Sequence, residues 1–228
     1  GTDLTLSPLF NSSGLVGYWK FDEGSGTSTQ DSSGNGNTGV ISGSPSWVTG
    51  KIGDAINFRG NTTDSVTIAT SSILDTDIHT ISFWILFTNS SASWYQIIAF
   101  PPSSPSSTDR SPGIWTYLGS NVDVHWRYDP NNTGANRAGP NGENTSFSQN
   151  VWYHIVGVKN GATLTLYVNG SQTETVTVAN PKKTGSAPLY FGRRANGSYA
   201  AFMQLDDVRI YNRALSAAEI YALYSATR

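Results

Sequence analysis

Residues 31–37, with the sequence DSSGNGN, place one acidic side chain beside a glycine-rich turn. The glycines allow a tight turn, in which several carbonyl oxygens can converge on one point. Calcium takes about six to eight such oxygens from carboxylates, Asn side chains and backbone carbonyls. Alone, the segment is a weak calcium signal, because it lacks the carboxylate spacing of an EF-hand loop. The alternative is a turn in which Asp31 accepts hydrogen bonds from nearby backbone N–H groups.

A second acidic pair, Asp206 and Asp207, lies in the run LDDVRIY at residues 205–211. If the apolar residues after the pair face a core, period-2 alternation places Asp206 on the same inward face and Asp207 on the other. An inward carboxylate needs a partner, since an unpaired buried charge is costly. A cation is one partner that fits, and a salt bridge to Arg209 or Lys51 is the other.

Carboxylate pairs suited to glycoside hydrolysis are missing from the sequence pattern. Glycosidases need two carboxyl groups about 5 Å apart or somewhat more, whereas Asp22 and Glu23 are neighbours on a predicted strand and project to opposite faces. The three histidines lie in separate predicted strands without metal-ligand spacing, and no nucleophile motif is present. We therefore predict that the chain is not an enzyme. A polysaccharide lyase is the remaining enzymatic alternative, and its groove would be lined by Gln96, Tyr117, His125 and Arg127.

The run NVDVHWRY at residues 121–128 alternates apolar and polar side chains. Alternation places Asp123, His125 and Arg127 on one face and the apolar residues on the other. Sugars are bound by aromatic rings that pack on their C–H faces, beside planar polar groups that bridge their hydroxyls. The predicted ligand-binding residues are Gln96, Trp115, Tyr117, Asp123, His125 and Arg127. For Trp115, and for Trp94 two residues before Gln96, burial in a core is the alternative.

The composition excludes several classes of protein. Only 13% of the 228 residues are charged, about half the usual fraction of roughly 25%, and the aromatic content of 12% excludes a charge-rich disordered chain or helical bundle. The net charge of −2 argues against a nucleic-acid partner. No apolar run reaches about 18 residues, so we expect no membrane insertion. The absence of cysteine is compatible with an extracellular location.

The elements that must position these residues are short strands separated by Gly, Pro, Asn and Ser clusters, as in a sandwich or barrel. Thirteen are predicted, too many for one flat sheet, so two packed antiparallel sheets are expected. Asn169-Gly170 predicts a hairpin with a type I′ turn, and Ser216 with Glu219 predicts a capping box at the start of a short C-terminal helix. The predicted strands are Leu15–Asp22, Gly39–Ser42, Ala55–Arg59, Ser65–Ala69, His79–Phe87, Trp94–Phe100, Gly113–Leu118, Val122–Tyr128, Trp152–Lys159, Thr163–Val168, Thr173–Val178, Leu189–Gly192 and Gln204–Tyr211.

Two long stretches lack strand character, Pro101–Pro112 and Asp129–Asn150. Long irregular loops in a compact domain are often functional, so we expect them to shape the rim of a binding groove. Tolerated surface insertions are the alternative.

Five motifs in order resemble the laminin-G-like jelly rolls of the concanavalin A-like lectin and glucanase superfamily: LVGYWKFDEGSG, DSSGNGNTG, GKIGDAINFRG, WYHIVGVKNGATLTLYVNG and LDDVRIYNRALSAAEIYALY. The resemblance runs from Leu15 to Tyr224, and the stretch Trp94–Asn150 matches none of the motifs. It implies an all-β jelly-roll sandwich, often with a structural Ca²⁺ between the N-terminal loop and the last long strand. Carried over, it nominates as metal ligands Asp31, the carbonyls of Gly34 and Asn37, and Asp206.

The sequence thus predicts an N-terminal extension or linker at residues 1–14 and one laminin-G-like domain at residues 15–228. The expected function is non-catalytic, extracellular or cell-surface recognition of a polysaccharide or glycan, with a structural calcium ion. A neutral glycan is favoured, because few charges remain to steer an acidic one. The alternatives are a protein-binding adhesion or filament-tip module, with a surface protein as partner and an exposed apolar patch, and a lyase or hydrolase with an unrecognised site.

Overall fold

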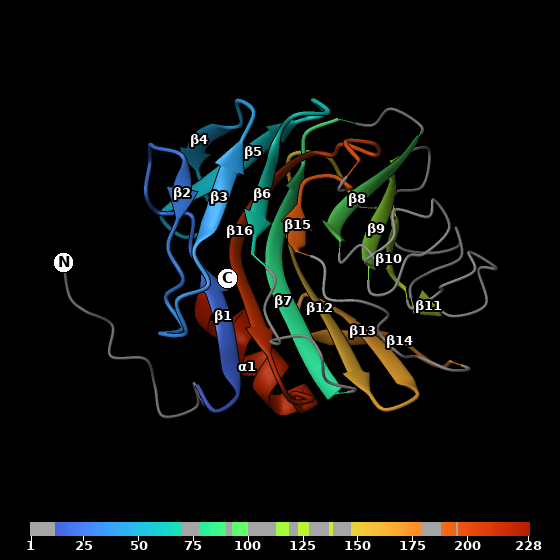
Figure 1. Ribbon diagram of the computed structural model, residues 1–228. Helices are drawn as coiled ribbons and strands as arrows, with labels where there is room; N and C mark the ends of the chain where they lie inside the picture. Colours follow the sequence, from blue (N-terminus) through green and yellow to red (C-terminus); the bar gives the residue numbers. More distant parts are fainter. Residues whose placement is uncertain are drawn as a thin grey trace.

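Two eight-stranded antiparallel sheets pack face to face in the computed structural model (Figure 1). The structure describes residues 12–69, 78–89, 93–99, 113–118, 123–127, 137–138, 147–178, 188–194 and 196–228. We call the face of each sheet that is turned away from the other sheet its outer face. The chain is therefore a mostly β sandwich, as predicted, and its arrangement is consistent with a jelly roll.

The first sheet, sheet A, is built around the long strands β7 and β16, which lie side by side. Strand β16 pairs with β5 through its first residues and with β1 through its last. In spatial order sheet A contains β14 (Ser171–Thr177), β13 (Thr163–Val168), β12 (Trp152–Asn160), β7 (Ile78–Phe87), β16 (Phe202–Tyr211), β5 (Asp54–Arg59) and β4 (Ser46–Thr49), with β1 (Leu15–Trp19) also on β16.

The second sheet, sheet B, carries the strands on which ligand binding was predicted. In spatial order it contains β11 (Arg137–Ala138), β10 (Asp123–Arg127), β9 (Gly113–Leu118), β8 (Ser93–Ala99), β15 (Leu189–Phe191), β6 (Ser65–Ile68), β3 (Gly39–Ser42) and β2 (Ser28–Thr29).

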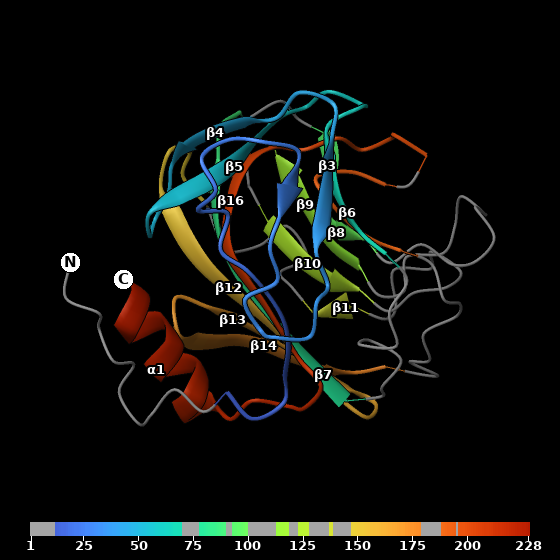
Figure 2. The ribbon, with the colours of Figure 1, turned by 60° about the vertical axis from the view of Figure 1, so that its left-hand side comes forward.

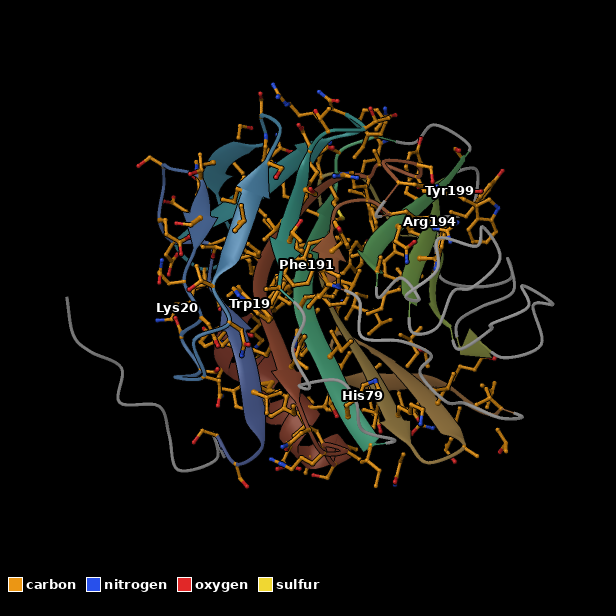
Figure 3. All side chains as sticks on the ribbon, viewed as in Figure 1. Trp19, Lys20, His79, Phe191, Arg194 and Tyr199 are labelled. Carbon is orange, nitrogen blue, oxygen red and sulfur yellow. The ribbon has the colours of Figure 1, made fainter. Side chains whose placement is uncertain are left out.

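The core between the sheets consists of apolar side chains at alternating strand positions. Trp19 is fully buried, and its ring meets Phe191 edge to face, with ring centroids 5.4 Å apart (Figure 3). Gly17 is required beside it, since an added Cβ would lie 2.5 Å from the Trp19 ring. Such aromatic pairs join sheet A to sheet B through contacts that local sequence rules do not specify.

A second apolar cluster lies on the outer face of sheet A, under helix α1 (Ala217–Thr227) (Figure 2). The predicted capping box is confirmed, because Ser216 Oγ accepts from the Glu219 backbone N–H and the Glu219 carboxylate accepts from the Ser216 backbone N–H. Ile220 and Leu223 of the helix are buried against the sheet. Trp84 of β7 donates to Thr227 of the helix, so α1 adds cover to the outer face of a strand that is buried along nearly its whole length.

The predicted hairpin is confirmed, with Asn169 at φ 49° and Gly170 at φ 78° between β13 and β14. Three short strands were not predicted: β2, β4 and β11, each of four residues or fewer. All three lie at sheet edges, where so few residues carry no readable alternation. Strand β11 falls inside 129–150, which was expected to be irregular; most of this stretch, and all of 101–112, lie outside the described residues.

Candidate functional site

Two rows of side chains, which include predicted ligand-binding residues, cross the outer face of sheet B. Backbone register pairs Gln96 of β8 with Trp115 of β9, and Trp94 with Tyr117. On β9 the residue before Trp115 is Ile114, which belongs to the core. Because side chains alternate along a strand, these four side chains point away from the core.

The same register continues into β10, where His125 pairs with Trp115 and Asp123 with Tyr117. Arg127 is opposite Gly113 at the end of the ladder. The predicted strand and its pairing are therefore present. The side chains of Asp123, His125 and Arg127 lie outside the described part of the chain, and their binding roles stay predictions.

Trp115 and Gln96 are not exposed, although they face away from the core. Trp115 is fully buried, and Gln96 is buried with its Nε2 donating to the Ile98 carbonyl at 3.0 Å. A sugar ring therefore has no direct access to Trp115 in this conformation. Trp94 and Tyr117 are only half-buried, and their ring centroids lie 5.2 Å apart, so the accessible aromatic surface lies at their end of the face.

Residues 192–194 and 196–201, which follow β15, cover the buried end of this face, and we call them the covering loop. The Gln96 N–H donates to the Tyr199 carbonyl at 2.9 Å, which anchors the loop to β8. The Tyr199 ring meets Trp115 edge to face at 5.1 Å, and the Arg194 guanidinium lies 5.7 Å from the Trp115 ring centroid (Figure 3). Tyr199 keeps 38% of its surface exposed.

Arg194 and Tyr199 were missed by sequence reasoning. They are more than seventy residues away from β9 in the chain, and no periodicity links a loop to a strand face. The only available signal was a cation and an aromatic residue within a short Asn/Gly/Ser segment, a composition typical of adaptable polar contacts.

The predicted metal ligand Asp31 has hydrogen-bond donors on both oxygens. Oδ1 accepts from the N–H groups of Tyr18 and Ser33, and Oδ2 accepts from the backbone and side-chain N–H groups of Asn37. Burial acts to raise the pKa of Asp31, but hydrogen bonds from Ser33, Asn37 and Tyr18 hold it below its usual value. The carbonyl of Asn37 accepts from Trp19 Nε1 at 2.8 Å. Asp31 thus accepts hydrogen bonds from nearby N–H groups and stabilises its own turn, which was the alternative to a calcium site.

The second predicted carboxylate, Asp206, lies on the outer face of sheet A, and its predicted inward position is wrong. The pairing of β16 with β7 shifts register between Asp206 and Arg209, and Asp207 at φ 53° forms this bulge. Leu205 and Val208 therefore both face the core. One extra residue reverses the phase of alternation, so Asp206 lies opposite Trp84 under the turn between β4 and β5.

Asp206 is fully buried there and holds that turn in place. Its Oδ2 accepts from the N–H groups of Lys51 and Ile52, both at 2.9 Å, while Oδ1 has no hydrogen-bond partner. Burial raises the pKa of Asp206 to about 8, against the two N–H groups that lower it. Neither alternative salt bridge forms, since Arg209 pairs with Asp207 at 3.0 Å and Lys51 uses its backbone N–H.

The four predicted calcium ligands do not form a common set of contacts. Asp31 and Asn37 contact β1, whereas Asp206 contacts the turn between β4 and β5. Gly34 has a φ of 87° and open space around its Cα. Among the residues that the structure describes, no group of three or more His, Cys, Asp or Glu side chains is arranged to hold a metal. Both Asp31 oxygens already accept hydrogen bonds from N–H groups, so this set of atoms does not fit a cation, whereas Asp206 Oδ1 accepts no hydrogen bond.

A family profile of laminin G domains, described as the concanavalin A-like lectin/glucanases superfamily, matches residues 59–221. The chain belongs to this superfamily. No curated protein sequence matches it. Membership of the superfamily establishes the fold and leaves the ligand open.

Solved structures with the same fold include binding domains. Domain 4 of an extracellular GH43 arabinanase from Geobacillus stearothermophilus, in complex with arabinotriose, superposes with a TM-score of 0.71 at 16% identity, covering 94% of this chain and all of that domain. The binding domain of Paraclostridial mosquitocidal protein 1 gives a TM-score of 0.69 at 19% identity, covering 93% of this chain and 52% of the other. The botulinum neurotoxin serotype D binding domain gives 0.69 at 16%, covering 94% and 52%. The chain thus spans about half the length of the toxin binding domains.

Within the described segments, no helix has the length and apolar character to cross a membrane.

Proposed function

We propose that this protein is a non-catalytic carbohydrate-binding domain that contacts glycans through the outer face of sheet B. The observation that carries the proposal is the group of partly exposed rings there: Trp94 and Tyr117 side by side on neighbouring strands, with Tyr199 on the covering loop. Partly exposed rings held by neighbouring rings offer a rigid apolar surface to the C–H face of a sugar. Arg194, beside Tyr199, adds hydrogen-bond donors for hydroxyl groups.

The related structures agree with this proposal, since the arabinanase domain was solved with arabinotriose and the toxin domains are binding domains. At below 20% identity they support the fold alone, and the choice of face rests on this chain's own side chains. By analogy with the extracellular arabinanase, we propose a location outside the cell.

A binding role without catalysis is supported by how described carboxylates are used. Asp22 accepts from the Asp54 backbone N–H, Glu23 accepts from the Gln30 backbone N–H, and Glu219 caps α1 and pairs with Arg213. Each of these groups stabilises a turn or a helix end. A glycosidase would instead require two carboxyl groups facing each other across a groove.

The adhesion alternative predicts a contiguous exposed apolar patch. The large apolar side chains that the described part of the chain exposes lie on separate elements: Val40, Ile52, Ile78, Val151, Tyr199 and Tyr221. Scattered exposed apolar residues are normal on soluble domains and do not favour a protein interface.

The test is binding to a panel of neutral and acidic polysaccharides, measured by calorimetry for Trp94→Ala, Tyr117→Ala and Tyr199→Ala. Each substitution removes one aromatic ring and should weaken glycan binding about tenfold, equivalent to about 1.4 kcal/mol. Tyr221→Ala is the matched control, because Tyr221 is an exposed aromatic residue on α1 at the outer face of the other sheet. Unchanged binding in all three variants would contradict the assignment to this face, and reducing-end or unsaturated products would contradict the non-catalytic role.

A further inference from the structure

His154 of β12 is buried on the outer face of sheet A, beneath the C-terminal half of α1. The residue has no exposed surface, and its Nε2 lies 2.9 Å from Ser82 Oγ. Its ring centroid lies 5.2 Å from that of Trp84 and is stacked at 6.1 Å with Tyr224 of the helix. Sheet and helix therefore enclose this imidazole from opposite sides.

The enclosure accommodates only the neutral imidazole. Neutral histidine has one N–H, and with that proton on Nε2 the Ser82 oxygen accepts it. Nδ1 is then a lone pair, and it is buried without a hydrogen-bond partner. Protonation would add a donor and a positive charge at Nδ1 with no acceptor to receive them, which is costly in a buried site.

The charges around His154 do not offset that cost. Burial first, and then the nearby Arg209 guanidinium, lower the pKa of His154 to about 3. Asp207 already accepts hydrogen bonds from Arg209 and Tyr18, and Asp206 accepts a backbone hydrogen bond from the turn at residues 50–53. Other titratable groups on this side of sheet A are Lys51 over the Trp84 ring, Tyr167 on β13 and Tyr211 on β16. Helix α1 carries Glu219, Tyr221 and Tyr224, while His79 and Lys159 lie on β7 and β12.

Helix α1 is the part of this enclosure that can move away from His154 at the lowest cost. Strands β7, β12 and β16 are joined by backbone ladders at the centre of sheet A, with one bulge between Asp206 and Arg209. The C-terminal half of α1 is held over them by side chains, among which Thr227 Oγ1 accepts from Trp84 Nε1 at 3.0 Å and Leu223 packs in the apolar cluster. Side-chain contacts at a chain end open at lower cost than a central ladder.

We propose that His154 makes the C-terminal half of helix α1 an acid-sensitive cover, which lifts from sheet A when the imidazole is protonated. The lifted state hydrates the imidazolium and exposes Trp84 and the underside of α1. At neutral pH the uncharged imidazole holds the cover closed. The cover does not depend on the glycan site, which lies on the outer face of the other sheet.

Hydrogen exchange measured by mass spectrometry at pH 7 and pH 5 tests the proposal on the intact chain. If the imidazole titrates at about 6.5 when hydrated and at about 3 when covered, the opening equilibrium should rise about 25-fold between these pH values. After correction for intrinsic exchange, amides of α1 should therefore exchange about 25-fold faster relative to those of β7 and β12. Equal acceleration in helix and strands would overturn the proposal, because it would indicate global acid unfolding.

Two variants separate this cover from general acid lability. His154→Gln keeps a neutral N–H donor for Ser82 and should reduce the acceleration in α1 to less than about threefold. His79→Gln removes another buried histidine, from β7, and should keep the wild-type response. A His154→Gln variant that still shows the full acid response would overturn the role of His154.

Discussion

Replacing Asp207 by Asn tests the buried charge network that joins β1 to β16. Asp207 is 2% exposed, and its two oxygens accept from the Tyr18 hydroxyl and, at 3.0 Å, from Arg209 Nη2. Its φ of 53° is in the left-handed region, which Asn tolerates, so the substitution removes the charge without backbone strain. The guanidinium of Arg209, 6% exposed, would then lose its carboxylate partner.

Removal of one partner from a buried ion pair costs about 3–5 kcal/mol, because the other charge stays buried. Arg209 keeps the Tyr18 hydroxyl at 2.7 Å, so we expect a loss near the lower value, about 3 kcal/mol. In urea, with a denaturant slope of about 3 kcal/mol/M, the unfolding midpoint should fall by about 1 M. Chemical denaturation followed by tryptophan fluorescence measures it.

The matched control is Asp64→Asn. Asp64 is also buried, but its cationic neighbour Arg59 is half exposed and lies 3.8 Å away, so the loss should be about 1 kcal/mol or less. The double variant Asp207→Asn with Arg209→Met should recover part of the loss, because no unpaired charge remains. A loss below about 1 kcal/mol for Asp207→Asn, or no recovery in the double variant, would refute the reasoning.

Two further predictions concern Glu219 and calcium. Hydrogen bonding from Arg213 lowers the pKa of Glu219 to about 2, so its stabilisation is present above about pH 4.5 and is lost as the pH falls towards 2. Because the pair is partly exposed, Glu219→Gln should cost about 1 kcal/mol or less at pH 7 and clearly less near pH 2, where Glu219 is about half protonated. A thermal-melt difference that is as large at pH 2 as at pH 7 would contradict this. If Asp206 contributes to a calcium site, added Ca²⁺ should raise the thermal midpoint and a chelator should lower it. An unchanged midpoint and no calcium by elemental analysis would exclude that site.

Local features of the fold could be predicted from the sequence because short-range geometry decides them. The Asn169-Gly170 turn, the Ser216–Glu219 capping box and the alternating strands all depend on contacts within a few residues. The superfamily follows from five ordered motifs. Edge strands of two to four residues escaped prediction, since their pairing partner and not their own pattern defines them.

The arrangement of the candidate site depended on contacts between distant segments. The extra residue at Asp207 turns Asp206 away from the core, and strict alternation cannot reveal such a bulge. The covering loop buries Trp115 and brings Tyr199 onto a strand face far away in sequence.

The sequence by itself determined a polar-surfaced β-sandwich, its hairpin and its helix cap, because hydrogen bonding and side-chain periodicity act locally. Only the tertiary structure decided which aromatic rings stay accessible on sheet B and which histidine is enclosed by α1. The physical reason is that burial depends on which segment covers a strand face. Trp115 and His154 are both covered by segments that lie more than seventy residues further along the chain or at its end.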